Sequence, residues 1–154
     1  MRHWLMKTEP GTFSVEDLAA APRATTSWDG VRNYQARNML RDEMKRGDLV
    51  FLYYSSTEVP GIAAIMEIVK DGYPDPTAFE RKHPHFDPDS DEASPRWFMV
   101  DVRLKRRLKR VIALTQLREH AAKELRGMVL LRPGNRLSVT PVEAAHWKFI
   151  LSLE

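Results

Sequence analysis

Large aromatic residues at turns and strand ends are the first residues of this sequence that could do chemistry. Trp28 stands before the turn Asp29-Gly30, where small or polar residues suffice, and Tyr34 follows closely. Tyr53 and Tyr54 end an apolar run just before two serines. Rings in such places can form a slot in which a flat nucleobase stacks, and each stacked base contributes about 1–3 kcal/mol. The alternative is that these rings only fill the core.

Polar side chains accompany the rings. Asn33 lies next to Tyr34, and its amide can both donate and accept hydrogen bonds, as the edge of a single base requires. Arg32 and Arg37 can pair with phosphate groups. Asn33 also stands where a helix needs a capping residue, so two roles compete for one side chain.

Basic residues gather in one segment. The chain has 24 Lys and Arg against 21 Asp and Glu, a formal net charge of +3, but six of the eight residues 103–110 are basic. A strand over this segment presents Arg103, Lys105, Arg107 and Lys109 on one face. Such a face can hold the phosphates of a nucleic acid. It can equally be a solvated strand edge that its charges protect from aggregation.

The segment 83–92, HPHFDPDSDE, has the opposite character and raises the question of a metal. His83 and His85 could ligate a metal, and Asp87, Asp89 and Asp91 after them have the spacing that opens a calcium loop. The glycine of such a loop falls at Glu92, and its bidentate glutamate falls at Phe98, so the pattern fails. We therefore predict an acidic loop with no metal.

Several classes of function are disfavoured. The chain has no cysteine, hence no disulfide or thiolate chemistry, and this suits an intracellular protein that we expect in the cytoplasm. No apolar run is long enough to cross a membrane. The sequence has no phosphate-binding loop and no nucleophile motif. We predict a protein without cofactor or catalysis; the alternative is an enzyme that acts on a nucleotide or RNA through a tyrosine, Lys7 or a histidine.

The elements that must position these residues alternate irregularly. Strands are predicted over 3–7, 48–56, 60–70, 96–111, 128–135 and 136–140. Helices are predicted over 14–21, where Ser14 and Asp17 form a variant of the capping box, over 34–45, over 114–124 and from a cap at Thr140 to about Leu151. A long loop over 71–95 could close over a site. This order argues against a parallel doubly wound sheet. It favours one α+β domain over 1–154, built on a curved mixed sheet or small barrel with helices around it.

Six motifs, in order along the chain, resemble the EVE domain family. They are WLMKTEP (4–10), WDGVRNYQARN (28–38), GDLVFLYYS (47–55), PGIAAIMEIVKDGYPDPT (60–77), PRWFMVDV (95–102) and MVLLRPGNRLSVTPV (128–142). The resemblance implies a PUA-like fold, a curved sheet that closes toward a barrel. It also implies a non-catalytic module that binds nucleic acid with a modified base, modified cytosine in DNA being the leading class. An RNA-binding domain without base selectivity is the alternative.

The resemblance also implies which residues form the site. The base-binding set is Lys7, Thr8, Trp28, Asn33, Tyr34, Tyr53, Tyr54, Ser55, Arg136, Leu137 and Ser138. The phosphate-binding set follows from the basic charges and not from the resemblance; it is Arg32, Arg37, Arg103, Lys105, Arg107 and Lys109. The base is expected between Trp28 and either Tyr34 or Tyr53. The family often has Ser at Thr8 and His at Tyr54, so these positions bear on which modification is read. A DNA-binding role also implies the nucleoid or, in a eukaryote, the nucleus.

Overall fold

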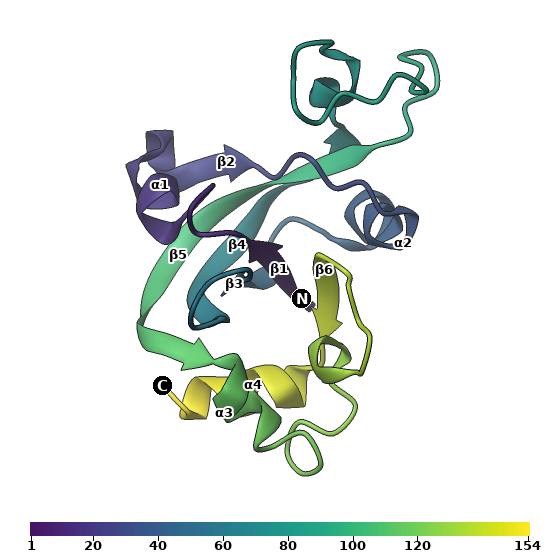
Figure 1. Ribbon diagram of the computed structural model, residues 1–154. Coiled ribbons are helices and arrows are strands. Elements are labelled where there is room, and N and C mark those ends of the chain that lie inside the picture. The colour runs from purple at the N-terminus through teal and green to yellow at the C-terminus, as the bar shows by residue number, and fades with distance from the viewer.

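A computed structural model describes all residues 1–154 and shows one mixed six-stranded sheet with short helices around it (Figure 1). The strands are β1 (His3–Thr8), β2 (Thr25–Ser27), β3 (Leu49–Tyr54), β4 (Gly61–Pro74), β5 (Phe98–Ala113) and β6 (Val139–Val142). Their order in the sheet is β2-β5-β4-β3-β1-β6. Only β1 and β3 run parallel. The predicted α+β class and curved mixed sheet are confirmed.

The two longest strands give the sheet its curl. Strands β4 and β5 have 14 and 16 residues, and their pairing shifts register at several places. Such irregularities bend a strand and increase its twist. At one end of this pair a Cβ on Gly61 would lie 2.3 Å from the carbonyl oxygen of Ile112, so only glycine fits there. The sheet curls without closing, because β2 and β6 remain its two edges.

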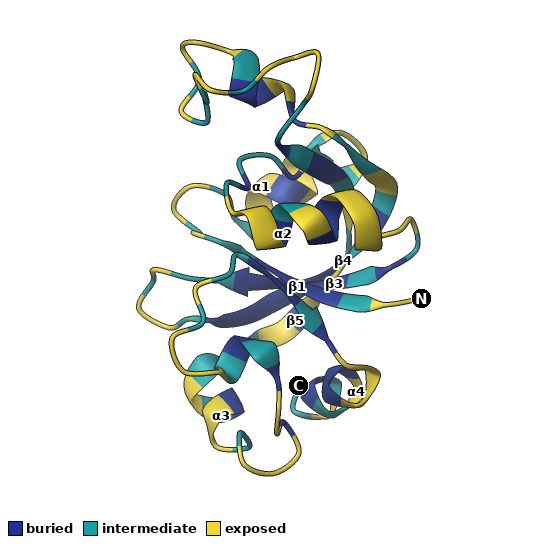
Figure 2. Ribbon diagram, turned by 90° about the vertical axis from the view of Figure 1, so that its right-hand side faces the viewer, coloured by how far each residue is buried: buried dark blue, intermediate teal, exposed yellow.

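Alternating side chains give the sheet two cores, one on each face. Trp4 and Met6 of β1 belong to the first core, whereas Leu5 between them belongs to the second. Strand β3 repeats the pattern, with Val50 and Leu52 in the first core and Phe51 and Tyr53 in the second. Strands buried on both faces lie at the centre of the molecule, as the dark central ribbons of Figure 2 show.

The helices cover both faces. They are α1 (Val15–Ala20), α2 (Tyr34–Asn38), α3 (Leu114–Arg118) and α4 (Ala144–Ser152), with a π-helical turn at Met39–Glu43 and 3-10 turns at Pro22–Ala24, Pro76–Phe79 and Val129–Leu131. Ser14 and Asp17 form the predicted capping box of α1. Asn33 caps α2, because its Oδ1 accepts a hydrogen bond from Ala36 N at 3.0 Å. Both caps confirm the sequence patterns.

Three predictions about elements were wrong. Strand β2 was missed because it has only three residues, all polar. The segment 128–135 forms a 3-10 turn at Val129–Leu131, not a strand. The last helix does not begin at Thr140, because residues Val139–Val142 pair with β1 as an edge strand, where proline costs no ladder bond. Helix α4 begins after Glu143 without a side-chain cap.

Residues 75–97 leave the sheet between β4 and β5 and project from it as an excursion (Figure 1). Two contacts close its ends. Asp75 N donates to Trp97 O at 2.9 Å, and Trp97 Nε1 donates to Asp87 Oδ2 at 2.6 Å. The excursion is thus held against the body by hydrogen bonds at its base.

No helix in the molecule has the length and apolar character that a membrane span needs.

Candidate functional site

A pocket of about 300 Å³ opens where β1, β2 and the excursion meet. Its lining residues are Lys7, Thr8, Thr12, Phe13, Thr26, Ser27, Trp28, Asp29 and His85. We call it the Trp28 pocket. Its size lies at the lower end of the range of ligand sites, and it combines aromatic walls with a few polar groups. Such a pocket suits a small, flat, polar ligand.

The aromatic part of the pocket consists of Trp28 and Phe13. The two rings meet edge to face at 90°, with centroids 6.2 Å apart. Trp28 N donates to Val100 O at 2.8 Å, which continues the pairing of β2 with β5 and holds the indole in place. Only 9% of Trp28 is exposed, so this residue both contributes to the core and lines the pocket.

Lys7 and Thr8 at the end of β1 supply the polar part. Burial lowers the pKa of the Lys7 ammonium, and no carboxylate offsets that effect. Thr8 Oγ1 donates to Phe13 O at 2.9 Å, which ties the turn after β1 to the aromatic wall. Because that bond uses only the hydroxyl proton, the oxygen of Thr8 can still accept. Asp29, from the loop after β2, and His85, from the excursion, also line the pocket.

Arg32 holds the loop beside the pocket instead of facing solvent. Its guanidinium makes five hydrogen bonds, to Asp75, Thr77, the carbonyl of Val31 and twice the carbonyl of His85. These five bonds use all the donors that a guanidinium has. This arrangement leaves Arg32 no free donor for the phosphate contact that the sequence predicts. Its partner Asp75 is fully buried and also accepts from Gly30 N at 2.9 Å.

Tyr34 is the exposed ring of the region but does not face Trp28. It stacks on Trp97 with centroids 4.9 Å apart, and the guanidinium of Arg37 lies 5.1 Å from its centroid. Arg37 also donates to the carbonyl of Arg96 at 2.6 Å. Tyr34 and Arg37 thus form a second aromatic and basic surface, outside the Trp28 pocket. Asn33 lies beside them as the cap of α2 and does not line the pocket.

Tyr53 and Tyr54 point to opposite faces of β3. Tyr53 is buried in the second core, on the face away from Trp28. The hydroxyl of Tyr54 accepts a hydrogen bond from Val15 N at 2.9 Å and so supports the start of α1. The predicted slot between Trp28 and either Tyr34 or Tyr53 does not form, because Phe13 is the ring that meets Trp28. Ser55 lies beside β1, where its N–H donates to Thr8 O at 2.9 Å.

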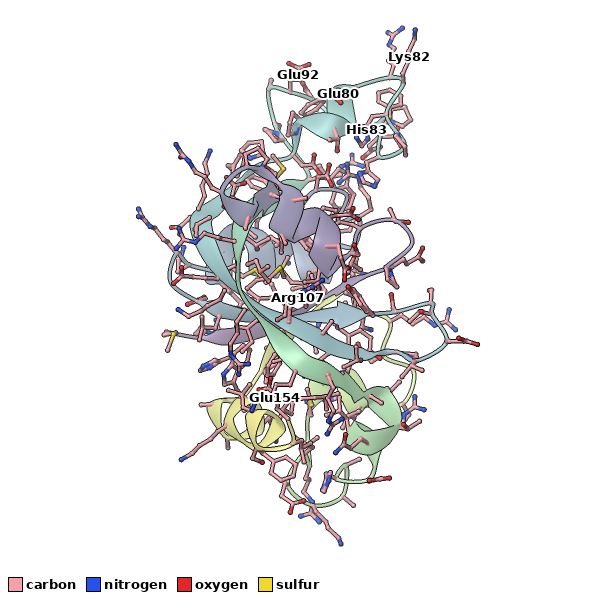
Figure 3. All side chains as sticks on the ribbon, turned by 90° about the vertical axis from the view of Figure 1, so that its left-hand side faces the viewer. Glu80, Lys82, His83, Glu92, Arg107 and Glu154 are labelled. Atoms are coloured by element: carbon pink, nitrogen blue, oxygen red, sulfur yellow. The ribbon has the colours of Figure 1, made fainter.

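The remaining predicted residues lie beside the pocket or along β5. Ser138 O accepts from Lys7 N at 2.9 Å, which places Arg136, Leu137 and Ser138 next to the end of β1. Arg103, Lys105, Arg107 and Lys109 are all exposed, and we call them the basic segment of β5. The predicted single basic face does not form, because the pairing of β5 with β4 shifts register between Ile65 and Met66, so that Leu104 packs on the first core and Leu108 lies in the second. Arg107 pairs with Glu16 of α1. Figure 3 shows Arg107 on the outer side of β5, with Glu154 below it and the excursion far above.

A larger hollow of about 400 Å³ lies at the opposite end of β1. Its lining includes Arg2, His3, Arg132 and His146 and has no Trp, Tyr or Phe. It therefore lacks the flat apolar walls that a stacked base needs. The aromatic lining therefore favours the smaller Trp28 pocket as the site that binds a base.

Sequence reasoning missed six of the nine residues that line the pocket. Phe13, Asp29 and His85 were not assigned to it, and neither were Thr12, Thr26 and Ser27. For Phe13 a signal existed, because it precedes the cap Ser14 at the position of a hydrophobic staple. For His85 no local signal exists, since the fold brings it from the excursion.

Comparison with known proteins gives matches along the whole chain. The model of the EVE domain matches residues 2–153. Thymocyte nuclear protein 1 of Homo sapiens is 49% identical over 167 residues, which cover 99% of this chain and 73% of the human protein. An uncharacterized protein of Schizosaccharomyces pombe is 39% identical and covers 99% of this chain and 68% of its own length.

Solved structures give the same result. The human THYN1 protein in complex with DNA containing 5-methylcytosine superposes with a TM-score of 0.94 at 48% identity, covering 99% of this chain and 97% of that one. A Pseudomonas syringae protein superposes with a TM-score of 0.92 at 43% identity, with 98% of each chain covered. An ASCH protein of Zymomonas mobilis, with a TM-score of 0.55 and 10% identity, shares the fold alone.

Proposed function

The chain belongs to the EVE domain family, and we propose that it is a non-catalytic module that binds DNA carrying 5-methylcytosine and holds the modified base in the Trp28 pocket. The observation that carries the proposal is the Trp28 pocket, in which polar groups surround a buried indole. The similarity of the chain to the human THYN1 protein, solved in complex with DNA containing 5-methylcytosine, supports it. The name of the human relative, thymocyte nuclear protein 1, supports the proposal that this protein acts on DNA in a nucleus or nucleoid.

The chemistry of the pocket fits the edge of a cytosine. A carboxylate is the group that accepts a hydrogen bond from the exocyclic amine of cytosine, and Asp29 supplies one. The carbonyl and ring nitrogen of the base need donors, which the Lys7 ammonium and the pocket hydroxyls supply. The methyl group of 5-methylcytosine needs an apolar contact, which Phe13 and Trp28 offer.

A base reaches such a pocket only when it leaves the duplex. Extrusion of a base costs a few kcal/mol of stacking and pairing. Stacking on Trp28 returns about 1–3 kcal/mol, and phosphate contacts contribute the rest. We assign those contacts to the basic segment of β5 and to the surface of Tyr34 and Arg37, which bind DNA whether or not it is methylated.

The basic segment of β5 gives a first prediction. Replacing Lys105 and Arg107 together by Ala is expected to weaken the binding of methylated and unmethylated DNA equally. Each lost phosphate contact reduces the slope of log affinity against log salt concentration by about 0.9. Titrations by fluorescence anisotropy at several salt concentrations measure this slope. A selective loss for methylated DNA contradicts the assignment.

A panel of short strands tests the proposed function. The strands are identical DNA and RNA oligonucleotides in which one cytosine is plain, 5-methylated or 5-hydroxymethylated. We expect the tightest binding to DNA with 5-methylcytosine and no chemical change in any strand. Equal affinity for every DNA, with preference for structured RNA, supports an RNA-binding domain without base selectivity. Turnover of a strand that disappears in Lys7→Ala makes the protein an enzyme.

A further inference from the structure

Three side chains that can ligate a metal meet at the mouth of the Trp28 pocket. They are Asp29 from the loop after β2 and His83 and His85 from the excursion. One ligand atom of each lies within 4.8 Å of the others, and His85 Nδ1 is 3.9 Å from Asp29 Oδ1. We propose that Asp29, His83 and His85 bind one divalent transition-metal ion. The site goes beyond the proposed function and does not depend on it.

The ring of His85 has an unused ligand atom. Its Nδ1 is buried and has no hydrogen-bond partner. A buried polar atom without a partner normally costs about 1–3 kcal/mol, so it needs an explanation. A metal ion bound to this nitrogen supplies one, because the lone pair then has a partner. The Asp29 oxygen at 3.9 Å is too distant for a hydrogen bond and leaves room for an ion between them.

The backbone around the cluster is held in place before any metal binds. Arg32 donates twice to the carbonyl of His85, at 2.8 and 3.2 Å. The same guanidinium pairs with Asp75, which accepts from Gly30 N next to Asp29. One buried network thus fixes both the loop that carries Asp29 and the backbone of His85. Ligands on a fixed backbone lose little entropy when they bind a metal.

Gly30 makes the close approach of His85 possible. Its φ is +79°, and a Cβ at this position would lie 2.4 Å from the imidazole of His85. The ring therefore lies directly against the loop, beside Asp29. His83 approaches from the other side, with its ring centroid 4.9 Å from that of His85. Figure 3 shows His83 on the excursion below Lys82, which lies at the tip.

Ligand type decides which metal fits. Two imidazoles and one carboxylate form a set found in zinc sites, and imidazole generally suits transition metals better than calcium or magnesium. A tetrahedral zinc ion with ligand distances of about 2.0–2.1 Å separates its ligand atoms by about 3.3 Å. Side-chain rotations that move the ligand atoms by about 1 Å bring the cluster to this spacing. His83 then gives up the hydrogen bond that its Nδ1 accepts from His85 N at 3.0 Å.

The sequence predicted no metal because only the acidic run 87–91 was compared with a known loop. Asp87 of that run is engaged elsewhere, since its Oδ2 accepts from Trp97 Nε1. The third ligand, Asp29, comes from a distant part of the chain. A metal here would join the excursion to the loop that carries Trp28. Three protein ligands leave a fourth position for water or for an oxygen of bound DNA.

Equilibrium dialysis of the untagged full chain against Zn²⁺ at pH 7.5, without DNA, tests the site. We expect one equivalent of Zn²⁺ and, with Co²⁺ as a probe, the visible absorption of a four-coordinate ion. His83→Gln and Asp29→Asn should each weaken Zn²⁺ binding at least about tenfold. His120→Gln is the matched control, because His120 lies 3.0 Å from Glu124 without a second histidine, and this variant should bind as the wild type does.

The possible outcomes are decisive. Failure of the wild type to bind Zn²⁺, or equal binding by wild type, His83→Gln and Asp29→Asn, overturns the proposal. Loss of Zn²⁺ in His120→Gln alone places the ion elsewhere and also overturns it. Circular dichroism checks that each variant is folded. Asp29 and His85 line the Trp28 pocket and His83 does not, so His83→Gln is the variant that separates loss of Zn²⁺ from loss of DNA recognition.

Discussion

Replacement of Trp28 by Ala is expected to abolish the preference for 5-methylcytosine over cytosine. The indole is the largest apolar wall of the Trp28 pocket, and without it neither the base nor its methyl group has a surface to stack on. Loss of one stacking platform costs about 1–3 kcal/mol, or roughly 5- to 150-fold in affinity for the methylated strand. Affinity for unmethylated DNA, which the basic segment of β5 holds, should change little. Anisotropy titrations of both duplexes measure the ratio.

Two further variants make this prediction selective. Trp28 is also a core residue, and truncation of such a ring costs about 3–5 kcal/mol of stability, so the folded fraction must be checked. Trp28→Phe keeps a ring in the core and should retain part of the preference. Tyr34→Ala removes an exposed ring outside the pocket and should lower both affinities equally. If Trp28→Ala lowers both equally as well, the pocket does not read the base.

Replacement of Asp75 by Ala should cause a large loss of stability. Asp75 is fully buried and accepts hydrogen bonds from Gly30, Arg32 and Thr77. Removing one partner of a buried ion pair leaves an uncompensated charge and costs about 3 kcal/mol, the lower end of the usual range, because Arg32 keeps some solvent contact. Urea denaturation measures the free energy of unfolding. Asp42→Ala, which breaks an exposed pair, is the control and should change it little.

The same carboxylate predicts how stability depends on pH. Burial alone raises the pKa of Asp75, but hydrogen bonds from Thr77, Gly30 and Arg32 outweigh it and lower the pKa below its usual value. A group with a lowered pKa in the folded state binds fewer protons than in the unfolded chain. Its stabilisation is fully present above the unfolded pKa of about 3.9 and is lost as the pH falls through the lower folded value. The stability of Asp75→Ala should therefore fall less than that of the wild type as the pH drops below 4. If both proteins lose the same amount of stability over the same pH range, this prediction is contradicted.

Local patterns in the sequence predicted the framework well. Apolar, β-branched and aromatic runs identified the segments of β1, β3 and β4 as strands, and Ser14 and Asn33 cap the helices that they were expected to cap. These patterns depend on neighbours in the chain, which a sequence displays directly. Where tertiary pairing decided the outcome, prediction failed: Thr140 lies in an edge strand because β1 needs a partner.

The site was harder to predict because it is assembled from distant segments. Trp28 was identified as a surplus ring, yet its partner is Phe13 from the turn after β1. The notion that Tyr53 and Tyr54 share one pocket was wrong, since neighbouring residues in a strand point to opposite faces. Arg32 looked like a phosphate ligand, but the buried Asp75 that binds it is 43 residues away.

Entry of the modified base into the Trp28 pocket is the central claim, and NMR of a labelled methyl group tests it most directly. A short duplex carries one 5-methylcytosine with a ¹³C-labelled methyl group, and its signal is followed as protein is added. The account predicts a new signal, displaced by the ring currents of Trp28 and Phe13, with nuclear Overhauser contacts to both rings. A methyl signal that stays at its duplex position in saturated complex, without contact to either ring, contradicts it.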